Sequence, residues 1–423
     1  MRALLKQRQF GLSKFSKRCT AQVVVAVSQR QERHLHESYI PKGHGGRSSF
    51  SGVVATVFGC TGFVGHVVVN HLAAMGSNVM LPFRGTGERG QRLKMMGDLG
   101  QCLLREGFSI KQEDDTIRDL IEHSNCVINL IGSRIPVNHY NMDEVNVEWP
   151  KRLAQLVAEK GDGTRFIHLT NLNCHQEEGR NVSNILQQNY EAERAICEIY
   201  PASTIVRSAN MHGFNDHYTH FFVDPRFSRF SYVGAYPVLY DGGHSTVVQP
   251  VSVSDAAEGI ARVTRHPDAM GHTFEFVGPD RFTLHDMCEY IFSAAREECH
   301  PYNTIGPLDR SKAKWHQQIF HKFLEIYFRR LFKPTPFLPR FLDLLLRDNW
   351  VNFDYYKQLH LTDRTTGAPG LHELGVEPMV FEDKAFEYFA SLHEDFVGRS
   401  GEEIPKTGPE MKEPVHGVPR LTT

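Results

Sequence analysis

Three glycines, each separated from the next by two residues, follow directly on a short apolar run. The run occupies residues 53–58, and the glycines are Gly59, Gly62 and Gly65. The run is rich in β-branched residues and has the length of a buried strand. In a strand–turn–helix unit, the first glycine bends the chain, the second lets the backbone approach a pyrophosphate, and the third lets the helix pack closely. The sequence therefore predicts a dinucleotide-binding turn; the alternative is a glycine-rich turn that binds no ligand.

Expected helices and strands alternate along the chain after this turn. A helix follows the glycines, because Val68, Leu72 and Met75 recur at helical spacing, and it ends near Gly76. We expect a loop with several glycines from residue 84 to residue 97. Further strands are expected at 78–83, within 101–110, and at 126–132, 165–170 and 203–207, with helices around 117–121 and at 148–160. Such alternation predicts a parallel sheet with right-handed crossovers.

Several landmarks give the chain a family resemblance over residues 52–290. They are the glycine triplet, Asn-Leu-Ile-Gly at 129–132, Ile-Val-Arg at 205–207 leading to Gly213, residues 248–255 and Phe-Val-Gly-Pro at 276–279. With these motifs the chain resembles the extended or atypical short-chain dehydrogenases. The resemblance implies an α/β, doubly wound parallel-sheet NAD(P)-binding Rossmann fold, followed by a mainly helical C-terminal extension.

Shorter segments carry a narrower resemblance. Residues 46–49, 96–100, 123–125, 127–132 and 166–168 occur in that order behind a basic N-terminus. In this the chain is similar to the short-chain-dehydrogenase-like accessory subunits of mitochondrial respiratory complex I, although the similarity thins after about residue 300. The resemblance implies a non-catalytic subunit that binds NADPH as a structural cofactor and supports assembly and stability. Other complex I subunits would be its partners, on the matrix side of the inner membrane.

The N-terminus has the composition of a mitochondrial presequence. Seven Lys or Arg residues and no acidic residue precede Glu32. We expect a presequence over residues 1–33 and a linker over 34–51. Without the eight basic residues and one acidic residue of 1–33, the formal net charge falls from −2 to −9. The alternative is a basic arm for nucleic acid, but no basic stripe follows it, so no nucleic-acid partner is expected.

The end of the second expected strand determines which nucleotide should bind. NAD sites place an acidic residue about 20 residues beyond the glycines, whereas here the strand ends in Arg84 and no carboxylate occurs before Glu88. A guanidinium can bind a 2′-phosphate through two parallel hydrogen bonds, which favours NADPH; the alternative is a surface arginine without a ligand. The expected cofactor-binding residues are Gly59, Thr61, Gly62, Phe63, Val64, Gly65, Arg84, Leu130, Ile131, Gly132 and Thr170.

One departure from the family pattern concerns the adenine. Many relatives end the third strand with an aspartate near this base, whereas the chain reads Phe-Ser-Ile-Lys at 108–111. We therefore expect an adenine contact that is weaker or rebuilt.

Reduction by this fold normally requires a tyrosine and a lysine four residues later on one helix. The lysine depresses the tyrosine pKa, which is otherwise near 10. No Tyr-x-x-x-Lys occurs in the 423 residues, and alignment of the expected helix puts Ile185 and Asn189 at the two positions. Tyr190 and Arg194 have the spacing but lie five positions late, about 140° around the helix. We expect no catalytic residue; the alternative is a stand-alone mitochondrial NADP-dependent reductase or epimerase of the same superfamily.

Composition limits the remaining possibilities. Eight cysteines are scattered without a Cys-x-x-Cys pair, so no metal site is expected. No apolar run approaches the roughly 18 residues that a membrane span requires. Residues 291–400 are expected to be helical, and their basic, aromatic stretch at 315–346 suits peripheral contact with the inner membrane or a partner, or else an ordinary core helix. Residues 401–423 read as a poorly ordered tail.

Overall fold

The computed structural model describes residues 41–85, 87–134, 140–161, 163–214, 216–223, 241–294, 315 and 353–389. Several regions singled out in the sequence lie wholly or partly outside these ranges, including parts of the expected linker at 34–51 and of the expected helical region at 291–400. The expected presequence at 1–33 and tail at 401–423 lie outside the described residues. So does the basic, aromatic stretch at 315–346, except for Trp315.

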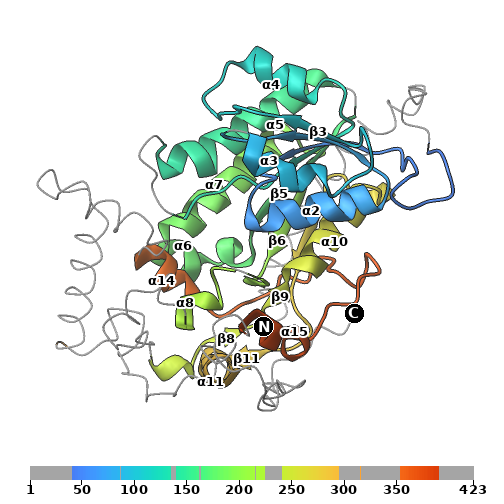
Figure 1. The fold of residues 1–423 in the computed structure, drawn as a ribbon. Coiled ribbons are helices and arrows are strands. Elements are labelled where there is room, and N and C mark those ends of the chain that lie inside the picture. The colour runs from blue at the N-terminus through green and yellow to red at the C-terminus, as the bar shows by residue number, and fades with distance from the viewer. Residues whose placement is uncertain are drawn as a thin grey trace, which may run out of the picture.

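The centre of the molecule is a parallel sheet of seven strands (Figure 1). Their order across the sheet is β10-β6-β5-β4-β1-β2-β3, and every neighbouring pair is parallel. The strands are β1 (Val54–Phe58), β2 (Asn78–Pro82), β3 (Cys102–Arg105), β4 (Cys126–Asn129), β5 (Arg165–Asn171), β6 (Thr204–Ser208) and β10 (Thr273–Phe276). This order confirms the doubly wound fold, because the chain leaves β1 in one direction for β2 and β3 and returns on the other side for β4.

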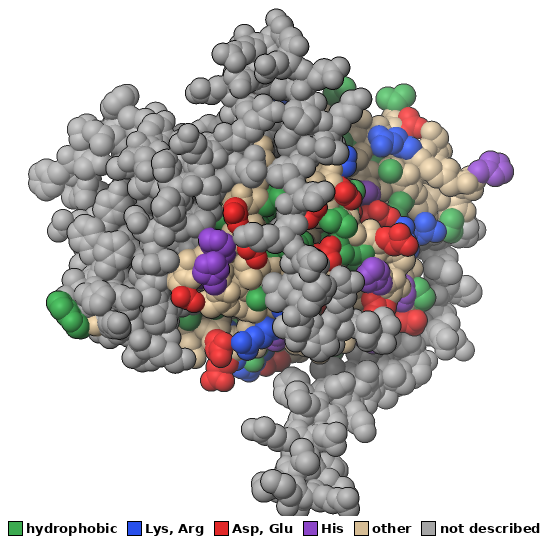
Figure 2. Space-filling view, turned by 90° about the horizontal axis from the view of Figure 1, so that it is seen from below, with side chains coloured by type: hydrophobic (Ala, Val, Ile, Leu, Met, Phe, Trp, Pro, Cys, Tyr) green, Lys and Arg blue, Asp and Glu red, His purple; other side chains and the backbone are tan. Residues whose placement is uncertain are grey.

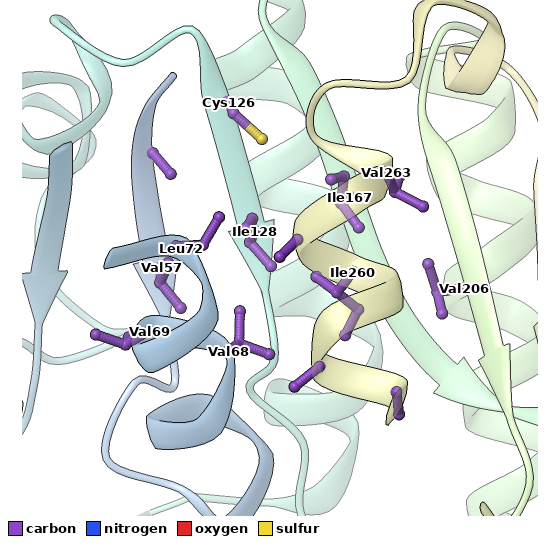
Figure 3. Close-up of a cluster of buried hydrophobic side chains, with 14 of the residues drawn as sticks. Val57, Val68, Val69, Leu72, Cys126, Ile128, Ile167, Val206, Ile260 and Val263 are labelled. Atoms are coloured by element: carbon purple, nitrogen blue, oxygen red, sulfur yellow. The ribbon is translucent and has the colours of Figure 1, made fainter. Parts of the chain in front are cut away.

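Helices cover both faces of the sheet because successive strand side chains point to opposite sides. On one face, Val57 and Ile128 pack with Leu72 and Ile260 of α2 (Phe63–Ala74) and α10 (Val253–Val263), as Figure 3 shows. On the other, Phe58 and its neighbours pack against α4, α5 and α7. These three helices are α4 (Asp114–Ile121), α5 (Trp149–Lys160) and α7 (Asn184–Ile199).

Most expected elements are confirmed to within a few residues, and one expectation is wrong. The glycine-containing loop expected at 84–97 includes a helix, α3 (Gly87–Lys94). Its inner face is Gly90, which lies against the Phe83 ring, and Leu93, which is buried. Gly90 therefore permits close packing of a helix, whereas its low helix propensity alone favours a loop.

The start of α5 also departs from regular geometry. A π-helical turn, Glu144–Glu148, runs directly into α5, which carries Pro150 in its first turn. Proline lacks the backbone N–H that a helix interior needs, and wide turns are one way to accommodate it.

A smaller lobe lies beyond the carboxyl edge of β5 and β6 (Figure 1). It contains two pairs of short strands, β7 (Met211–His212) with β9 (Val251–Ser252), and β8 (Val247–Val248) with β11 (Phe282–Thr283). Its helices are α6 (Glu177–Val182), α8 (His220–Val223), α11 (Leu284–Ala294), α14 (Phe353–Leu359) and α15 (Phe381–Phe389). Three single turns of 3₁₀ helix complete the described structure, at Leu172–His175, Asp241–Gly243 and Pro267–Ala269.

The segment 353–389 is anchored to both lobes by buried polar contacts. Asp363 accepts hydrogen bonds from the Asn173 side chain at 2.8 Å and from the Gln249 amide at 2.8 Å. Thr366 donates to Glu275 of β10, which also pairs with Arg207 of β6. Burial would make each of these groups costly if it were unpaired, so the segment forms part of the fold.

Membrane spans, cysteines and surface charge were three concerns of the sequence analysis, and the described residues bear on each. None of the described helices is long and apolar enough to cross a membrane. Six cysteines lie in this part; none forms a disulfide with another described residue, and five of them are buried. On the face shown in Figure 2, the described acidic side chains are scattered and the described Lys and Arg form no continuous stripe.

Candidate nucleotide-binding site

The carboxyl edge of the sheet between β1 and β4 is the point where the strand order reverses. In open α/β sheets, ligands bind in the crevice at such a point. Of the expected site residues, the glycine turn follows β1, Arg84 follows β2, Leu130–Gly132 follow β4 and Thr170 lies at the end of β5. The fold therefore brings all of them to one edge of the sheet.

The glycine turn is tightly closed by its own backbone. Gly59 has φ +87°, and its carbonyl accepts the Gly62 amide at 3.0 Å. A Cβ atom on Gly59 would lie 2.9 Å from the Leu130 carbonyl carbon, so the turn packs directly on the chain leaving β4. A Cβ atom on Gly65 would lie 2.1 Å from the Gly59 carbonyl oxygen. Side chains are excluded at both positions, and α2 begins in close contact with β1.

The beginning of α2 is open to a ligand. Thr61 and Gly62 are exposed, and a Cβ atom on Gly62 would approach only the Gly59 carbonyl oxygen, at 3.2 Å. Gly62 is the N-cap and offers no capping side chain, and the fully described first turn of α2 has no acidic residue. Helix N-termini of this kind attract phosphate through their amides and their dipole. The cradle therefore fits a pyrophosphate.

Phe63 and the ends of β4 and β5 line the same edge. The Phe63 ring lies against Gly213, which follows β7. Asn129 is buried at the end of β4, where its Oδ1 accepts the Trp149 indole N–H at 3.1 Å and the Ile131 amide at 3.3 Å. The hydroxyl of Thr170 donates inward to the sulfur of Cys174 at 3.8 Å.

Arg84 is exposed at the end of β2, as an interaction with a 2′-phosphate requires. Its guanidinium carbon lies 5.8 Å from the centre of the Tyr140 ring, within the range of a cation–π contact. Tyr140 follows β4 and was not among the residues expected from the sequence, because nothing in the local pattern connects positions 84 and 140.

Helix α7 contains Ile185 and Asn189, the two positions that the sequence analysis aligned with the tyrosine and the lysine. Ile185 is only 4% exposed. Asp354 of α14 covers this end of α7, accepting hydrogen bonds from the Asn184 and Ile185 amides at 3.0 Å each and from the Ser183 hydroxyl at 2.9 Å. The position expected for the tyrosine thus holds a buried isoleucine, whose amide is bound by a residue of the C-terminal segment.

The displaced pair, Tyr190 and Arg194, does not act as a unit. The Tyr190 ring stacks with the guanidinium of Arg180, 4.2 Å from its centre. Arg194 is exposed and pairs with Glu198 at 3.2 Å. Arg194 therefore has its ion pair with Glu198, whereas Tyr190 has its cation–π contact with Arg180.

Known proteins were compared with the whole chain, and no established family profile matches it. Subunit 9 of the mitochondrial NADH dehydrogenase (ubiquinone) 1 alpha subcomplex of Rattus norvegicus is 37% identical over 356 residues, 84% of each chain. This chain belongs to that subunit family. The 40 kDa subunit of NADH-ubiquinone oxidoreductase of Neurospora crassa is 32% identical over 282 residues, which are 65% of this chain and 71% of that one.

Solved structures agree on the fold of this subunit 9 family member. A structure of the pinoresinol-lariciresinol and phenylcoumaran benzylic ether reductases covers 79% of this chain and 99% of that chain, with a TM-score of 0.53. The match to an NADPH-dependent quinone oxidoreductase of Escherichia coli, complexed with NADPH, covers 80% of this chain and 99% of that chain, with a TM-score of 0.50. Both are 14% identical in sequence, so they establish a shared dehydrogenase-type fold and nothing further.

Proposed function

We propose that this protein is a non-catalytic accessory subunit of mitochondrial complex I that holds NADPH as a structural cofactor and thereby supports assembly of the complex. One combination of features carries the proposal. The edge of the sheet has a closed glycine turn and an open helix N-terminus that fit a pyrophosphate, while the helix that should supply the proton donor has a buried isoleucine there. Membership of the subunit 9 family supports the other complex I subunits as partners.

The choice of NADPH rests on Arg84. It is exposed at the end of β2, and no carboxylate occurs there until Glu88. The E. coli quinone oxidoreductase with this fold is described as NADPH-dependent. Replacement of Arg84 by alanine should weaken recognition of the 2′-phosphate by about 1.5–3 kcal/mol, as is typical for hydrogen bonds to charged groups.

Bound NADPH would supply a hydride, and the residues of this chain would hold it without completing a reaction. The glycine turn and the α2 amides would bind the pyrophosphate, Leu130, Ile131 and Gly132 would line the crevice, and Arg84 would meet the 2′-phosphate. Ile185 has no proton to give and Asn189 has no charge. Loss of a positioned general acid alone costs a factor of about 10²–10⁴ in rate.

The experiment that tests the cofactor is release and identification of nucleotide from the purified protein. NADPH should be recovered by chromatography in nearly stoichiometric amount. Recovery of mainly NADH, or of no nucleotide, would contradict the proposal.

The role in assembly has its own test. A ligand that binds only the native state stabilises it by about 2.7 kcal/mol at a hundredfold excess over its Kd. Gly62→Asp places a carboxylate where the pyrophosphate should lie, so it should lower the abundance of the subunit and of assembled complex. In complexes of matched abundance that carry an NADPH analogue unable to donate a hydride, NADH:quinone activity per complex should stay near normal. A large drop would mean that the nucleotide takes part in electron transfer.

We also propose the matrix side of the inner membrane as the location. The basic, acid-free N-terminus and the mitochondrial relatives support it. Mass spectrometry of the mitochondrial protein should find the presequence removed, and a pool that retains Met1 would contradict this.

On native size separation the protein should comigrate with the large NADH-oxidising assembly, whereas a free pool alone would favour a stand-alone reductase. Peripheral membrane contact through 315–346 remains part of the proposal.

A further inference from the structure

Three loops from different strands meet beside the proposed 2′-phosphate position. Arg84 follows β2, Ser109 and Lys111 follow β3, and Tyr140 follows β4. The Lys111 ammonium lies 5.1 Å from the centre of the Tyr140 ring, and the Arg84 guanidinium carbon lies 5.8 Å from it. The Tyr140 and Ser109 hydroxyls are 2.8 Å apart. One aromatic ring therefore contacts both cations and is itself held by a hydrogen bond.

The charge of this cluster is partly balanced within the protein. Lys111 pairs with Glu144 at 3.0 Å, and Glu144 also accepts the Asn141 amide at 3.1 Å. The hydrogen bond from Lys111 holds the pKa of Glu144 below its ordinary value. Lys111 is still about half exposed, with a relative side-chain accessibility of 53%, so its ammonium can meet a ligand.

We propose that Lys111 is the second cation of the 2′-phosphate site, and that Tyr140 is a positioning residue that holds Arg84 and Lys111 toward the same phosphate. The inference rests on the proposed binding of NADPH. A phosphate monoester carries a charge of about −1.5 to −2 at pH 7. Arg84 alone leaves part of that charge unmatched, and a lysine acts as a point charge beside the bidentate guanidinium. The Ser-Ile-Lys sequence that lacks the usual aspartate thus has a role of its own in choosing the nucleotide.

The charged part of the proposal is tested by nucleotide binding to the full-length mature protein. Adenosine 2′,5′-bisphosphate and 5′-AMP isolate the subsite from the nicotinamide end, and NADPH and NADH complete the series. Lys111→Met should weaken the two 2′-phosphorylated ligands about tenfold, a change of about 1.4 kcal/mol, and leave 5′-AMP and NADH nearly unchanged. Lys111→Arg should retain the preference. Glu144→Gln should tighten the 2′-phosphorylated ligands a few-fold, because it removes a neighbouring negative charge.

The positioning role of Tyr140 predicts a different pattern. Tyr140→Leu removes the ring and should reduce the preference for the 2′-phosphate several-fold, whereas Tyr140→Phe keeps the cation–π contacts and should stay close to the unmodified protein. Salt should weaken the preference less in Lys111→Met than in the unmodified protein, since one charge contact is missing. Arg118→Met is the control for loss of a positive charge elsewhere, and it should leave the preference for the 2′-phosphate unchanged. It removes an exposed cation that pairs with Asp115 and Glu159 on the covering helices.

The outcomes separate the two proposals. If the unmodified protein binds none of the four ligands, the proposed NADPH function fails and this inference with it. If it prefers the 2′-phosphorylated ligands and Lys111→Met keeps that preference, the function stands and the role of Lys111 is overturned. Glu144→Gln keeps the size of a side chain that is 29% exposed, so an unchanged preference in a folded Glu144→Gln protein would also count against the proposal.

Discussion

Single residues of the glycine triplet have separable tasks. Gly65 lies where any side chain would collide with the backbone of the turn, whereas a Cβ atom on Gly62 would meet only the Gly59 carbonyl oxygen, at 3.2 Å. The first is therefore required by packing and the second by the proposed ligand.

Gly65→Ala should accordingly lower stability. Its Cβ would lie 2.1 Å from the Gly59 carbonyl oxygen and 2.8 Å from the Cys60 Cα, so backbone must move. We expect the free energy of unfolding to fall by about 1–3 kcal/mol, the usual cost of overpacking, in urea titrations of the nucleotide-free protein. Gly62→Ala is the matched control and should change the free energy of unfolding by less than about 1 kcal/mol. Equal effects of the two changes would contradict this assignment.

Two buried histidines make the fold sensitive to acid. Burial lowers the pKa of His168 to about 4 and that of His212 to about 4, from an ordinary 6.5. Neither ring nitrogen of His212 has a hydrogen-bond partner among the described residues, and its ring packs edge-on against Phe381, 4.8 Å between centres. Above pH 6.5 these histidines are mostly neutral in both the folded and the unfolded protein. Between pH 6.5 and 4 they bind a proton mainly in the unfolded protein, so the free energy of unfolding falls as the pH falls.

His212→Phe should make this acid loss shallower. Each such histidine contributes a slope of about 1.4 kcal/mol per pH unit between pH 6 and 4.5. The variant keeps an aromatic ring beside Phe381 but cannot bind a proton. Urea unfolding of the variant and of the unmodified protein at several pH values in this window measures the difference in slope. Parallel pH profiles would show that His212 is not protonated on unfolding.

At the scale of elements, the start of α7 depends on a distant helix. Ser183 caps α7 only weakly, accepting the Leu186 amide at 3.4 Å. Asp354 of α14 takes the Asn184 and Ile185 amides with its two carboxylate oxygens. A carboxylate at a helix N-terminus is stabilised by the amides and by the helix dipole.

Asp354→Ala should therefore destabilise α7 and α14 together. We expect a loss of about 1.5–3 kcal/mol, since amide hydrogen bonds to a charged group disappear, and faster hydrogen exchange at Ile185 and Leu186. Asp354→Asn keeps one acceptor oxygen, so its stability should lie between those of the unmodified protein and Asp354→Ala. Asp115→Ala, which removes an exposed surface pair, should cost less than about 1 kcal/mol. A loss no larger than this control would mean that α14 does not cap α7.

At the scale of the whole molecule, the C-terminal segment joins elements that lie far apart in the sequence. Segment 353–389 contacts the start of α7, the 3₁₀ turn after β5 through Asn173, and β10 through Glu275. Asp354 of this segment accepts the Ile185 amide, and the Ile185 side chain is buried. The position at which the sequence predicts no catalytic tyrosine therefore holds a buried isoleucine at a helix start that is capped from α14.

Restoring the missing pair should therefore not restore activity. In the double variant Ile185→Tyr and Asn189→Lys, the new phenol would have to fit a position that is 4% exposed and capped by Asp354. We expect lower stability, by about 1–3 kcal/mol for overpacking, and no oxidation of NADPH in the presence of quinones or small carbonyl compounds, followed by absorbance at 340 nm. Turnover by this variant would show that only the two side chains separate the protein from an active reductase.

The sequence by itself determined the features that depend on near neighbours. Glycine spacing after an apolar run and the alternation of strands and helices are local patterns. They were sufficient to predict the Rossmann fold and the edge where Gly59, Arg84 and Leu130 gather. The lack of a Tyr-x-x-x-Lys is also read directly from the sequence. Parallel strands end at the same edge, so positions that follow them converge whatever the loops contain.

Only the tertiary structure decided which distant loops meet. Tyr140 contacts Arg84 and Lys111, and Asp354 contacts Ile185, through the path of the chain and the packing of layers that no local pattern encodes. The helix α3 belongs to the same class, because Gly90 is favourable there only when the Phe83 ring lies against it. Propensity sums over a few residues, whereas packing depends on residues far apart in the sequence, and where the two conflict packing prevails.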